Sequence, residues 1–461
     1  MFTKKPKNQV MQEHISKNYL CKSIIKYILA VAIFLFLILV IYIHISPTVS
    51  PSLGTTRLNI ETYLAGNNQP THPSVYTFDT SWNGYKYWMA YSPYPNGNGE
   101  EENPCIAVSN DLYYWETPGT LANPIADNEE TGCDELKDPH ILYRKDLDRI
   151  EVWYLGRLSQ RLGGSEDDHL LLLRKYSFDG VTWSDYEIMT EIDYLSPSII
   201  WDGEKYQMWA IGYDLYGTSG TISYQESKDG YNWTNKTLCS INGENTGISI
   251  WHGSVTEYNG TYYMCFIDNK GKQKIFCCTS YDGIQFYNAQ SIIENNKFWR
   301  NLYRPFLWYD GNQYICIYGV VNAANEWYIT MSKGTSLDCL IGINHADLSK
   351  MYPLTDSTTN THSMMYYLKA MYHAVRNYLR IELMLLALIE IILMRIRPKL
   401  YTSNKYFFIC QILNIFISVY WIVIKMQLSK IFNLIAAIFA ILIINISMSA
   451  LLSWAKLCHS R

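Results

Sequence analysis

The sequence has little that would point to a metal site or to nucleic acid. Its 11 cysteines form no C-x-x-C pair and no H-x-x-x-H pattern occurs, so a zinc site is not expected. The formal net charge is only −4 at pH 7, and no basic patch with interleaved aromatics occurs outside the flanks of the apolar stretches. We therefore expect no metal ion, no cofactor and no nucleic-acid partner.

Aromatic residues, in contrast, are abundant. They make up 15% of the 461 residues and include 39 tyrosines and 14 tryptophans. Aromatic side chains favour β-strands, and their flat apolar faces suit contact with sugar rings. The composition thus favours a β-rich protein that contacts carbohydrate.

A short motif recurs along the middle of the chain. In its clearest copy, Lys137-Asp138-Pro139-His140-Ile141-Leu142-Tyr143, a polar residue and a proline lead into an apolar run. The other copies are His72-Pro73-Ser74-Val75, Ser196-Pro197-Ser198-Ile199-Ile200, His252-Gly253-Ser254-Val255 and Arg304-Pro305-Phe306-Leu307. The period of roughly 50–65 residues is the length of a propeller blade.

Two further signatures accompany these copies. The first is a turn before an aromatic strand, typical of a β-hairpin, at Asn83-Gly84, Asp202-Gly203, Asn259-Gly260 and Asp310-Gly311. The second is Ser-x-Asp-Gly-x-x-Trp, at residues 177–183 and 227–233 and in weaker form at 109–115 and 280–286. We expect its Asp to cap its own turn and its Trp to pack between blades.

Five such units, each of about four short strands, predict an all-β five-bladed β-propeller. The alternative is a β-sandwich with accidental internal similarity, but three signatures in one order disfavour it. Cys265 and Cys316 occupy equivalent strand positions, which suggests core packing. Cys105 and Cys133 flank the first connection between blades and are candidates for a disulfide outside the cytoplasm.

Apolar stretches on both sides of the repeats predict transmembrane helices. Residues 1–23 are polar and lysine-rich, and residues 24–46 are apolar and long enough to anchor the chain in a bilayer. The predicted propeller covers residues 56–350, a polar tether covers 351–377, and a membrane region of two to three helices covers 378–456. The stretch 378–396 contains two glutamates, which are costly inside a bilayer. It is therefore either a transmembrane helix or a helix that lies at the membrane interface.

The positive-inside bias then gives the location of the propeller. We expect a multi-pass protein of the plasma membrane with the propeller on the extracytoplasmic side. Its partners would be the lipid bilayer, a carbohydrate and, through the C-terminal helices, another membrane protein.

The candidate site is the mouth of the central channel, where the inner strands of a propeller begin. Strand starts and the ends of the neighbouring strands lie on the same rim of an antiparallel meander. The catalytic candidates are Asp138, Glu102, His72 and His252, and the substrate-binding candidates are Arg304, His140, Trp251, Tyr91, Ser196 and Asp268. A glycosidase needs two carboxyl groups across the glycosidic bond, and Asp138 and Glu102 are the two we expect there.

Several alternatives stay open for these residues. Asp138 would alternatively make a structural hydrogen bond that closes the channel, and the histidines would be ordinary residues at strand entries. Histidine can act as acid or base near neutral pH. Arg304 would hold an anionic group or lower the pKa of a neighbouring acid.

The repeat region resembles the five-bladed glycoside hydrolase superfamily that includes families 43, 32, 68, 117 and 130, and it looks family 43-like. The phrases that carry the resemblance are His72-Pro73-Ser74, residues 83–91, Glu102-Asn103-Pro104, Asp138-Pro139-His140, Trp251-His252 and Tyr303-Arg304-Pro305. The resemblance implies three acids at the starts of the first three inner strands. The orienting acid matches Asp138, whereas His72 and Ser196 stand where the other two acids would be.

This departure leaves three readings of function. The first is an extracytoplasmic glycoside hydrolase or related glycan-modifying enzyme, with Glu102 as a replacement acid. The second is a catalytically degenerate propeller that binds a glycan. The third is a docking module in a system that assembles or exports surface polysaccharide. Two carboxyl groups within glycosidase range at the mouth would favour the enzyme.

Overall fold

The computed structural model describes residues 50–158, 169–212, 220–241, 250–268, 274–295, 301–322 and 324–344, together with Lys369. The chain forms two compact units, Pro47–His362 and Met1–Ser46 with Ser363–Arg461. All described residues except Lys369 belong to the first unit. No helix among them is long and apolar enough to cross a membrane, and the predicted spans at 24–46 and within 378–456 lie outside the described residues.

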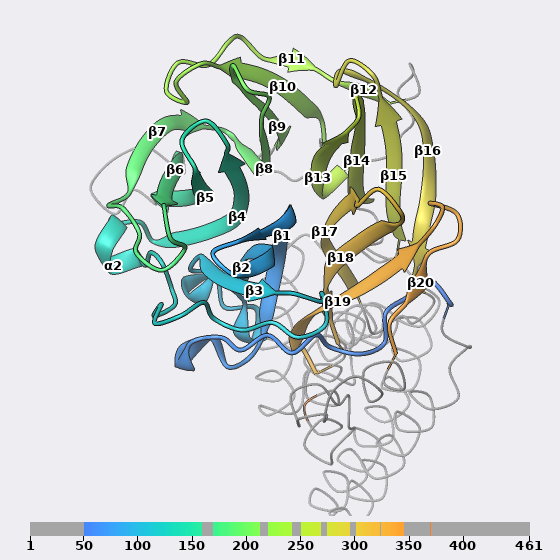
Figure 1. The fold of residues 1–461 in the computed structure, drawn as a ribbon, viewed down its shortest axis with the longest axis horizontal. Helices are drawn as coiled ribbons and strands as arrows, with labels where there is room; N and C mark the ends of the chain where they lie inside the picture. Colours follow the sequence, from blue (N-terminus) through green and yellow to red (C-terminus); the bar gives the residue numbers. More distant parts are fainter. Residues whose placement is uncertain are drawn as a thin grey trace, which may run out of the picture. The chain divides into compact units, whose positions relative to one another are not determined.

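Five antiparallel sheets follow one another along the chain and are arranged around a centre as the blades of a propeller (Figure 1). Blades 1 and 2 comprise β1 (Pro70–Trp82), β2 (Tyr85–Pro93), β3 (Cys105–Ser109), β4 (Glu135–Arg144), β5 (Arg149–Leu158), β6 (His169–Ser177) and β7 (Glu187–Ile192). Blade 3 comprises β8 (Tyr194–Trp201), β9 (Tyr206–Gly212), β10 (Ile222–Ser227) and β11 (Thr237–Leu238). The prediction of a five-bladed propeller is confirmed.

The last two blades complete the ring. Blade 4 comprises β13 (Ile250–Tyr258), β14 (Thr261–Asp268), β15 (Lys274–Ser280) and β16 (Gln285–Glu294), with the short β12 (Ser240–Ile241) parallel to β16. Blade 5 comprises β17 (Asn301–Tyr309), β18 (Tyr314–Val321), β19 (Trp327–Gly334) and β20 (Ile341–Gly342). The described helices are short: η1 (Leu64–Gly66), η2 (Pro95–Gly97), η3 (Gly99–Glu101) and α2 (Asn128–Thr131).

Blade 1 departs from the four-strand pattern. Its sheet has three strands, and a fourth is reduced to a bridge in which Val108 and Glu116 exchange backbone hydrogen bonds of 2.8 and 3.0 Å. The Asn-Gly hairpins are present as predicted. Asn83 and Gly84 both have positive φ, 47° and 91°, as a type I′ turn requires.

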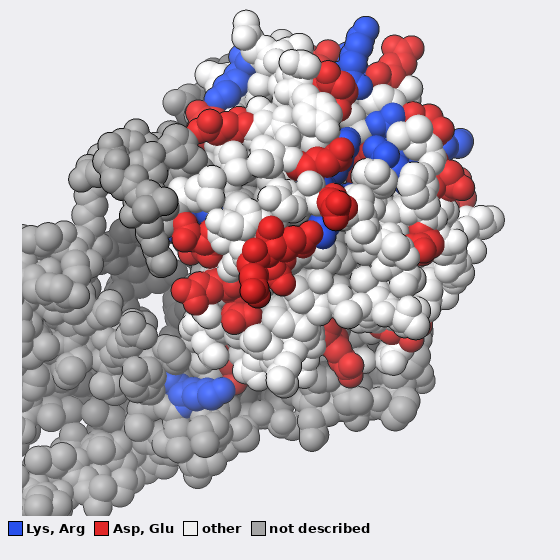
Figure 2. All heavy atoms as spheres, turned by 90° about the vertical axis from the view of Figure 1, so that its left-hand side faces the viewer, with Lys and Arg blue, Asp and Glu red and all other residues white. Residues whose placement is uncertain are grey.

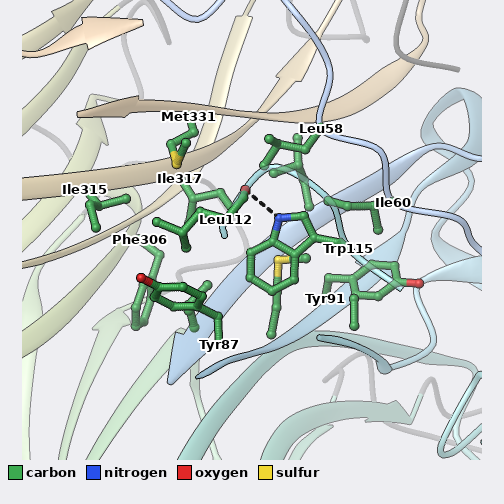
Figure 3. Packing of buried hydrophobic residues seen from close by; sticks show 14 of the residues in the cluster. Leu58, Ile60, Tyr87, Tyr91, Leu112, Trp115, Phe306, Ile315, Ile317 and Met331 are labelled. Atoms are coloured by element: carbon green, nitrogen blue, oxygen red, sulfur yellow. Dashed lines mark hydrogen bonds between the residues drawn. The ribbon is translucent and has the colours of Figure 1, made fainter. Parts of the chain in front are cut away.

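The segment before blade 1 closes the ring against blade 5. The backbone N–H of Leu58 donates to Ile329 (2.9 Å), and that of Thr55 donates to Ile343 (2.8 Å). Leu58 then packs in an apolar cluster between blades 5 and 1, together with Trp115, whose indole N–H donates to the carbonyl of Leu112 at 2.8 Å (Figure 3).

The Ser-x-Asp-Gly turns stabilise the contacts between neighbouring blades. In the turn of blade 2, the Asp179 carboxylate accepts the backbone N–H groups of Val181 (2.8 Å) and Thr182 (2.7 Å), so this Asp caps its own turn as predicted. Gly180 has φ +76°, and a Cβ there would lie 2.0 Å from the indole of Trp88 in blade 1. The same contact repeats further round the ring, where Gly230 meets Trp153 and Gly283 meets Trp209.

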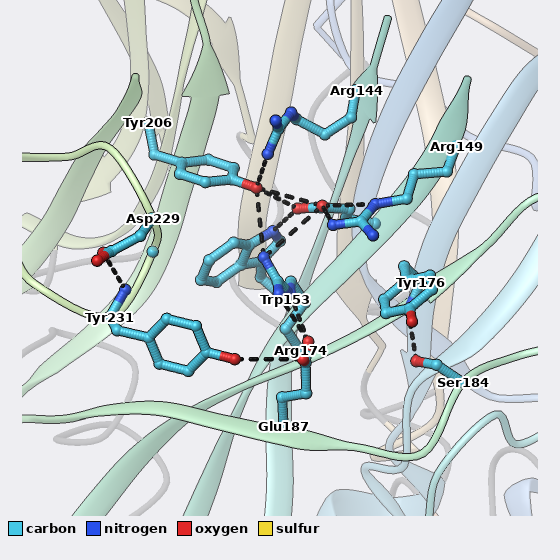
Figure 4. Close-up of polar contacts among 12 residues, drawn as sticks. Arg144, Arg149, Trp153, Arg174, Tyr176, Ser184, Glu187, Tyr206, Asp229 and Tyr231 are labelled. Atoms are coloured by element: carbon cyan, nitrogen blue, oxygen red, sulfur yellow. Dashed lines mark hydrogen bonds and ion pairs between the residues drawn. The ribbon is translucent and has the colours of Figure 1, made fainter. Parts of the chain in front are cut away.

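A buried polar cluster joins blades 2 and 3 (Figure 4). The fully buried Glu151 carboxylate accepts from Arg149 at 2.5 Å, from the Tyr206 hydroxyl at 3.0 Å and from the Trp153 indole N–H at 3.1 Å. Arg174 lies 3.7 Å from the same carboxylate and makes its own ion pair with Glu187 at 2.7 Å. Every charge in this cluster has an opposite partner, so it stabilises the packing of the two blades.

The cysteines that the structure describes are free thiols. Cys265 and Cys316 are fully buried in the core between blades 4 and 5, which confirms their packing role. Cys105 and Cys133 are both buried, and the thiol of Cys105 contacts the backbone carbonyl of Asn103 at 3.4 Å. The disulfide considered between them is therefore not formed.

Candidate functional site

The recurring motif forms a β-bulge at the start of each inner strand. The register of pairing shifts between Thr71 and Ser74, Lys137 and His140, Leu195 and Ser198, Ile250 and Gly253, and Tyr303 and Phe306. A bulge re-aims the side chain of the extra residue, and proline is tolerated there because the ladder hydrogen bond is already interrupted. The local sequence thus turns five side chains towards the mouth of the channel.

Four of these five residues have a left-handed backbone. The φ angles are 52° for His72, 57° for Asp138, 50° for Ser196 and 26° for Arg304. A non-glycine residue in this region costs about 1–3 kcal/mol and is retained where the surrounding structure enforces it, often at functional sites. The four residues occupy equivalent positions in different blades, so the strained backbone is a shared feature of the bulges that form the mouth.

Asp138 lies at the centre of the site and connects three blades. Its carboxylate accepts from the Arg304 guanidinium at 2.6 Å and from the backbone N–H of Ser196 at 2.8 Å. Both charged side chains are buried, and Arg304 also donates to the carbonyl of Pro139 at 3.2 Å. Burial alone would raise the pKa of Asp138, but the Arg304 charge and then the two neighbouring histidines hold it below its usual range. Asp138 is therefore ionised.

The pKa of Glu102 is shifted in the opposite direction to that of Asp138. It is 6% exposed, and burial, followed by the negative charge of Asp138, raises its pKa well above the usual value. Burial therefore favours the protonated form of Glu102, whereas the Arg304 charge favours the ionised form of Asp138. Two carboxyl groups whose environments separate their pKa values in this way are typical of acid and base assignments in an active site.

The His72 imidazole lies between these two carboxyl groups. Its Nδ1 is 2.9 Å from the Ser92 hydroxyl and 3.4 Å from Glu102, and its Nε2 is 3.7 Å from Asp138. Burial lowers the pKa of His72 well below its usual value, against the opposing effect of Asp138, so the ring is neutral. Among the described residues, Nε2 has no hydrogen-bond partner although it is buried, and such an atom calls for an explanation.

His252 forms a second polar chain at the mouth. Its Nδ1 is hydrogen-bonded to the Ser196 hydroxyl at 2.6 Å and its Nε2 to the Tyr303 hydroxyl at 2.8 Å. The rings of His72 and His252 lie 5.7 Å apart, and that of Tyr303 is 4.5 Å from His252. Tyr303 was missed as a candidate, although it precedes Arg304-Pro305 just as the candidate Trp251 precedes His252-Gly253.

A cavity of about 860 Å³ opens at this cluster. Six residues of the cluster line it: His72, Glu102, Asp138, Trp251, His252 and Tyr303. Ser196 and Arg304 support Asp138 from behind through the hydrogen bonds described above. The structure therefore brings together most of the residues that the sequence placed at the mouth.

Two substrate-binding candidates have other roles, which corrects the sequence-based prediction. Tyr91 is fully buried in the core between blades 1 and 5, where its hydroxyl donates to the carbonyl of Glu61 at 2.7 Å. His140 is hydrogen-bonded to the Ser74 hydroxyl at 3.1 Å and the Ile199 carbonyl at 2.8 Å, which connects blades 1, 2 and 3. Burial lowers the pKa of His140 to about 3.

Asp268 is the remaining substrate-binding candidate. Asp268 ends β14 opposite Ile250, but its side chain lies outside the described part of the structure, and its role stays a prediction.

Side chains of the types that bind divalent metal ions are present at the mouth: His72, His252, Asp138 and Glu102. In the described ranges, no three His, Cys, Asp or Glu side chains are arranged as a metal site.

Part of the chain is similar in sequence to a curated protein. No family model matches the chain. Over 232 residues the chain is 27% identical to the A type blood N-acetyl-α-D-galactosamine deacetylase of Flavonifractor plautii, a match that covers 41% of this chain and 29% of that protein. The chain therefore spans under a third of the length of this curated relative.

Solved structures with a similar fold were also found. An N-acetylgalactosamine deacetylase from F. plautii, in complex with blood group B trisaccharide, superposes with a TM-score of 0.52 at 17% identity, covering 62% of this chain and 95% of that one. A GH43_1 enzyme from Xanthomonas citri gives a TM-score of 0.44 at 9% identity, covering 65% and 95%. The described residues thus form a five-bladed β-propeller of the type found in the deacetylase structure.

Proposed function

We propose that the chain is a glycan-acting hydrolase that removes an acyl group from a sugar at the mouth of the propeller. The observation that carries this proposal is the neutral His72 imidazole between Asp138, whose pKa is lowered, and Glu102, whose pKa is raised well above its usual value, at a cavity that all three residues line. The identity of the curated relative, named as a deacetylase, supports the choice of reaction.

The site fits acyl hydrolysis better than glycosidic cleavage. A glycosidase uses two carboxyl groups that face the bond from opposite sides. Here the Asp138 oxygens are engaged by Arg304 and Ser196, and an imidazole lies between the two carboxyl groups. Acyl hydrolysis requires instead a base for water and donors for the developing oxyanion, and the mouth contains both.

The roles follow from the protonation states. A His72 tautomer that donates Nδ1–H to Ser92 leaves Nε2 to accept a proton from water, whose oxygen then forms a bond to the acyl carbon. The Glu102 acid and the Tyr303 hydroxyl, held by His252, are the donors for the oxyanion. When the bond from the acyl carbon to the sugar nitrogen or oxygen breaks, the proton passes from His72 to the leaving atom, which gives a carboxylic acid and a free amine or hydroxyl; the acid then loses its proton to the solvent.

The membrane topology forms part of the proposal. The apolar stretch at 24–46 and those within 378–456 support an anchored chain, and the lysines of residues 1–23 support a propeller outside the cytoplasm. The substrate would then be a poly- or oligosaccharide at or beyond the cell surface, and the C-terminal helices would contact a membrane-protein partner.

A second candidate is a propeller that binds glycan without catalysis. It is favoured by the complete engagement of Asp138 in structural hydrogen bonds and by Ser196, which replaces an acid of the resembling families. Such a module would dock partners in the assembly or export of surface polysaccharide.

The test separates the three activities in one assay. The full-length chain, purified in detergent with divalent cations present, is incubated with N-acetylated and O-acetylated glycans, and acetate, new reducing ends and binding are measured in the same wells. We expect acetate release by the parent and its loss in Glu102→Ala, which removes the donor, whereas Glu102→Gln, which keeps a donor, should retain part of it. New reducing ends without acetate would show glycosidic cleavage instead, and binding without either product would leave the degenerate propeller.

A further inference from the structure

The cavity is not confined to the mouth of the channel. From His72 and Tyr303 it continues between blades 2 and 3, where its lining includes Thr190 of β7, Gln225 of β10 and Trp233. Its volume of about 860 Å³ lies in the upper part of the ~300–1,000 Å³ range typical of pockets for drug-sized ligands. One acylated sugar is smaller than such a ligand, so the groove has room for more of the glycan.

The floor of this extension is apolar and well packed. Leu170, Ile192 and Met208 line it and are at most 8% exposed. Trp233 adds a half-buried indole whose ring lies 6.3 Å from Trp153 and whose N–H donates to the carbonyl of Gly230 at 2.8 Å. Because the indole N–H already has a hydrogen-bond partner, the apolar ring of Trp233 is available to stack on the face of a sugar ring in the groove.

The charges along the groove balance one another. Apart from the mouth, the lining contains three cations, Lys137, Arg157 and Lys236, and three carboxylates, Glu135, Glu191 and Asp193. Glu135 pairs with Lys137 at 3.0 Å and with Arg157 at 3.1 Å, and Lys236 pairs with Asp193. Acidic side chains also gather on the blade 2 side of the propeller (Figure 2). The groove therefore holds no excess of positive charge that would select an anionic glycan.

We propose that the groove between blades 2 and 3 is a second subsite, which binds uncharged sugars that continue the glycan beyond the reacting residue. Trp233 provides the stacking surface, and Thr190 and Gln225 line the wall. The inference rests on the proposed function only in placing the reacting sugar at the mouth. It makes an oligosaccharide, rather than a free monosaccharide, the preferred ligand.

Two groove variants with matched controls test this subsite in the full-length chain. Thr190→Trp fills the groove without removing a core residue, and its control Thr237→Trp changes an exposed threonine of β11. Trp233→Ala removes the stacking surface, and its control Trp183→Ala changes the equivalent tryptophan of the blade 2 turn, which is outside the cavity lining.

The probes are N-acetylgalactosamine, an uncharged tetrasaccharide that carries it at the non-reducing end, and an anionic tetrasaccharide of the same length. Affinity is measured by calorimetry, and acetate release is measured separately. We expect the uncharged tetrasaccharide to bind about tenfold or more tightly than the monosaccharide. Thr190→Trp and Trp233→Ala should remove this difference and leave monosaccharide binding unchanged, whereas both controls should retain it.

Equal affinity for the two lengths, or a length preference that survives both groove variants, would overturn the subsite. Tighter binding of the anionic tetrasaccharide would overturn its neutral character. Because affinity is read without turnover, a length preference in the absence of acetate release would support the subsite while the deacylase proposal fails.

Discussion

Two buried polar clusters lie in the same propeller and differ in how completely their groups are satisfied. Around Glu151, between blades 2 and 3, each carboxylate oxygen accepts hydrogen bonds and each arginine has an acidic partner (Figure 4). At the channel mouth, His72 has an Nε2 without a hydrogen-bond partner among the described residues, and burial raises the pKa of Glu102 well above its usual value.

The backbone shows the same difference. The residues around Glu151 have ordinary φ angles, whereas four residues at the mouth have a left-handed backbone. We expect a completely satisfied cluster to have a structural role, and an incomplete and strained one is the better candidate for binding a ligand. Buried charge alone therefore does not identify the functional site of this propeller.

The largest expected effect comes from the two buried histidines of the inner strands. His72→Asn should lower the acyl-hydrolase activity about 10²- to 10⁴-fold, because it removes a proton-transfer group, and Asn tolerates the left-handed backbone at this position. His140→Asn should leave the activity of the folded protein within about threefold, because His140 only connects blades. Steady-state kinetics on both variants checks this, and equal losses would contradict it.

The second prediction compares the two buried carboxylates. Asp138→Asn leaves the buried Arg304 charge without its acidic partner, and Glu151→Gln removes the acidic partner of the partly buried Arg149, so each should lower the free energy of unfolding, by up to about 3–5 kcal/mol. Only Asp138→Asn should also reduce activity per folded molecule. Urea unfolding and active-site titration separate the two quantities, and a loss of specific activity in Glu151→Gln would remove the distinction between the clusters.

The third prediction concerns the turns on which the blade contacts depend. Gly180→Ala should lower the free energy of unfolding by about 2–4 kcal/mol, because its Cβ would collide with Trp88 in addition to adopting φ +76°. Gly203→Ala is the control, since φ there is +106° and no atom lies within 4 Å of the added Cβ. It should cost only about 1–2 kcal/mol. Similar losses in thermal or urea unfolding would show that the Trp88 contact contributes little.

The smallest effect is the pH dependence of stability. The folded protein holds His140 neutral with a pKa of about 3, whereas the unfolded chain binds this proton near the usual value of 6.5. Its stabilising contribution is complete above pH 6.5 and is lost as the pH falls from there towards 3, with a slope of at most about 1.4 kcal/mol per pH unit. His72 acts in the same direction.

His140→Asn should therefore have a shallower decline than the parent between pH 6.5 and 4.5. Urea unfolding at several pH values in this range measures the slope. An unchanged slope in the variant would show that His140 is not held neutral by the fold.

Most of the fold was accessible from local sequence signals. The Asn83-Gly84 turn requires positive φ at both positions, and the Asp179 turn closes through hydrogen bonds within four residues. Such signals act over short distances, so they are visible in any one repeat. Each of these turn signals occurs four times, and together with the five copies of the strand-start motif they predicted the propeller.

The candidate site was accessible only in part. The mouth position of Asp138, His72 and His252 followed from the repeat, because equivalent strand starts must meet at the axis. The same reasoning misplaced Tyr91 and omitted Tyr303. Which side of a twisted strand faces the cavity depends on neighbouring blades, and no single repeat contains that information.

The sequence by itself determined the number of blades, the hairpins and turns, and the residues at the starts of the inner strands, because these depend on local backbone preferences repeated at a regular spacing. Only the tertiary structure decided that the pKa of Asp138 is lowered, that the pKa of Glu102 is raised and that the cavity continues between blades 2 and 3. Protonation depends on burial and on charges such as Arg304, which lies 166 residues from Asp138 along the chain, and a groove depends on how two separate sheets diverge.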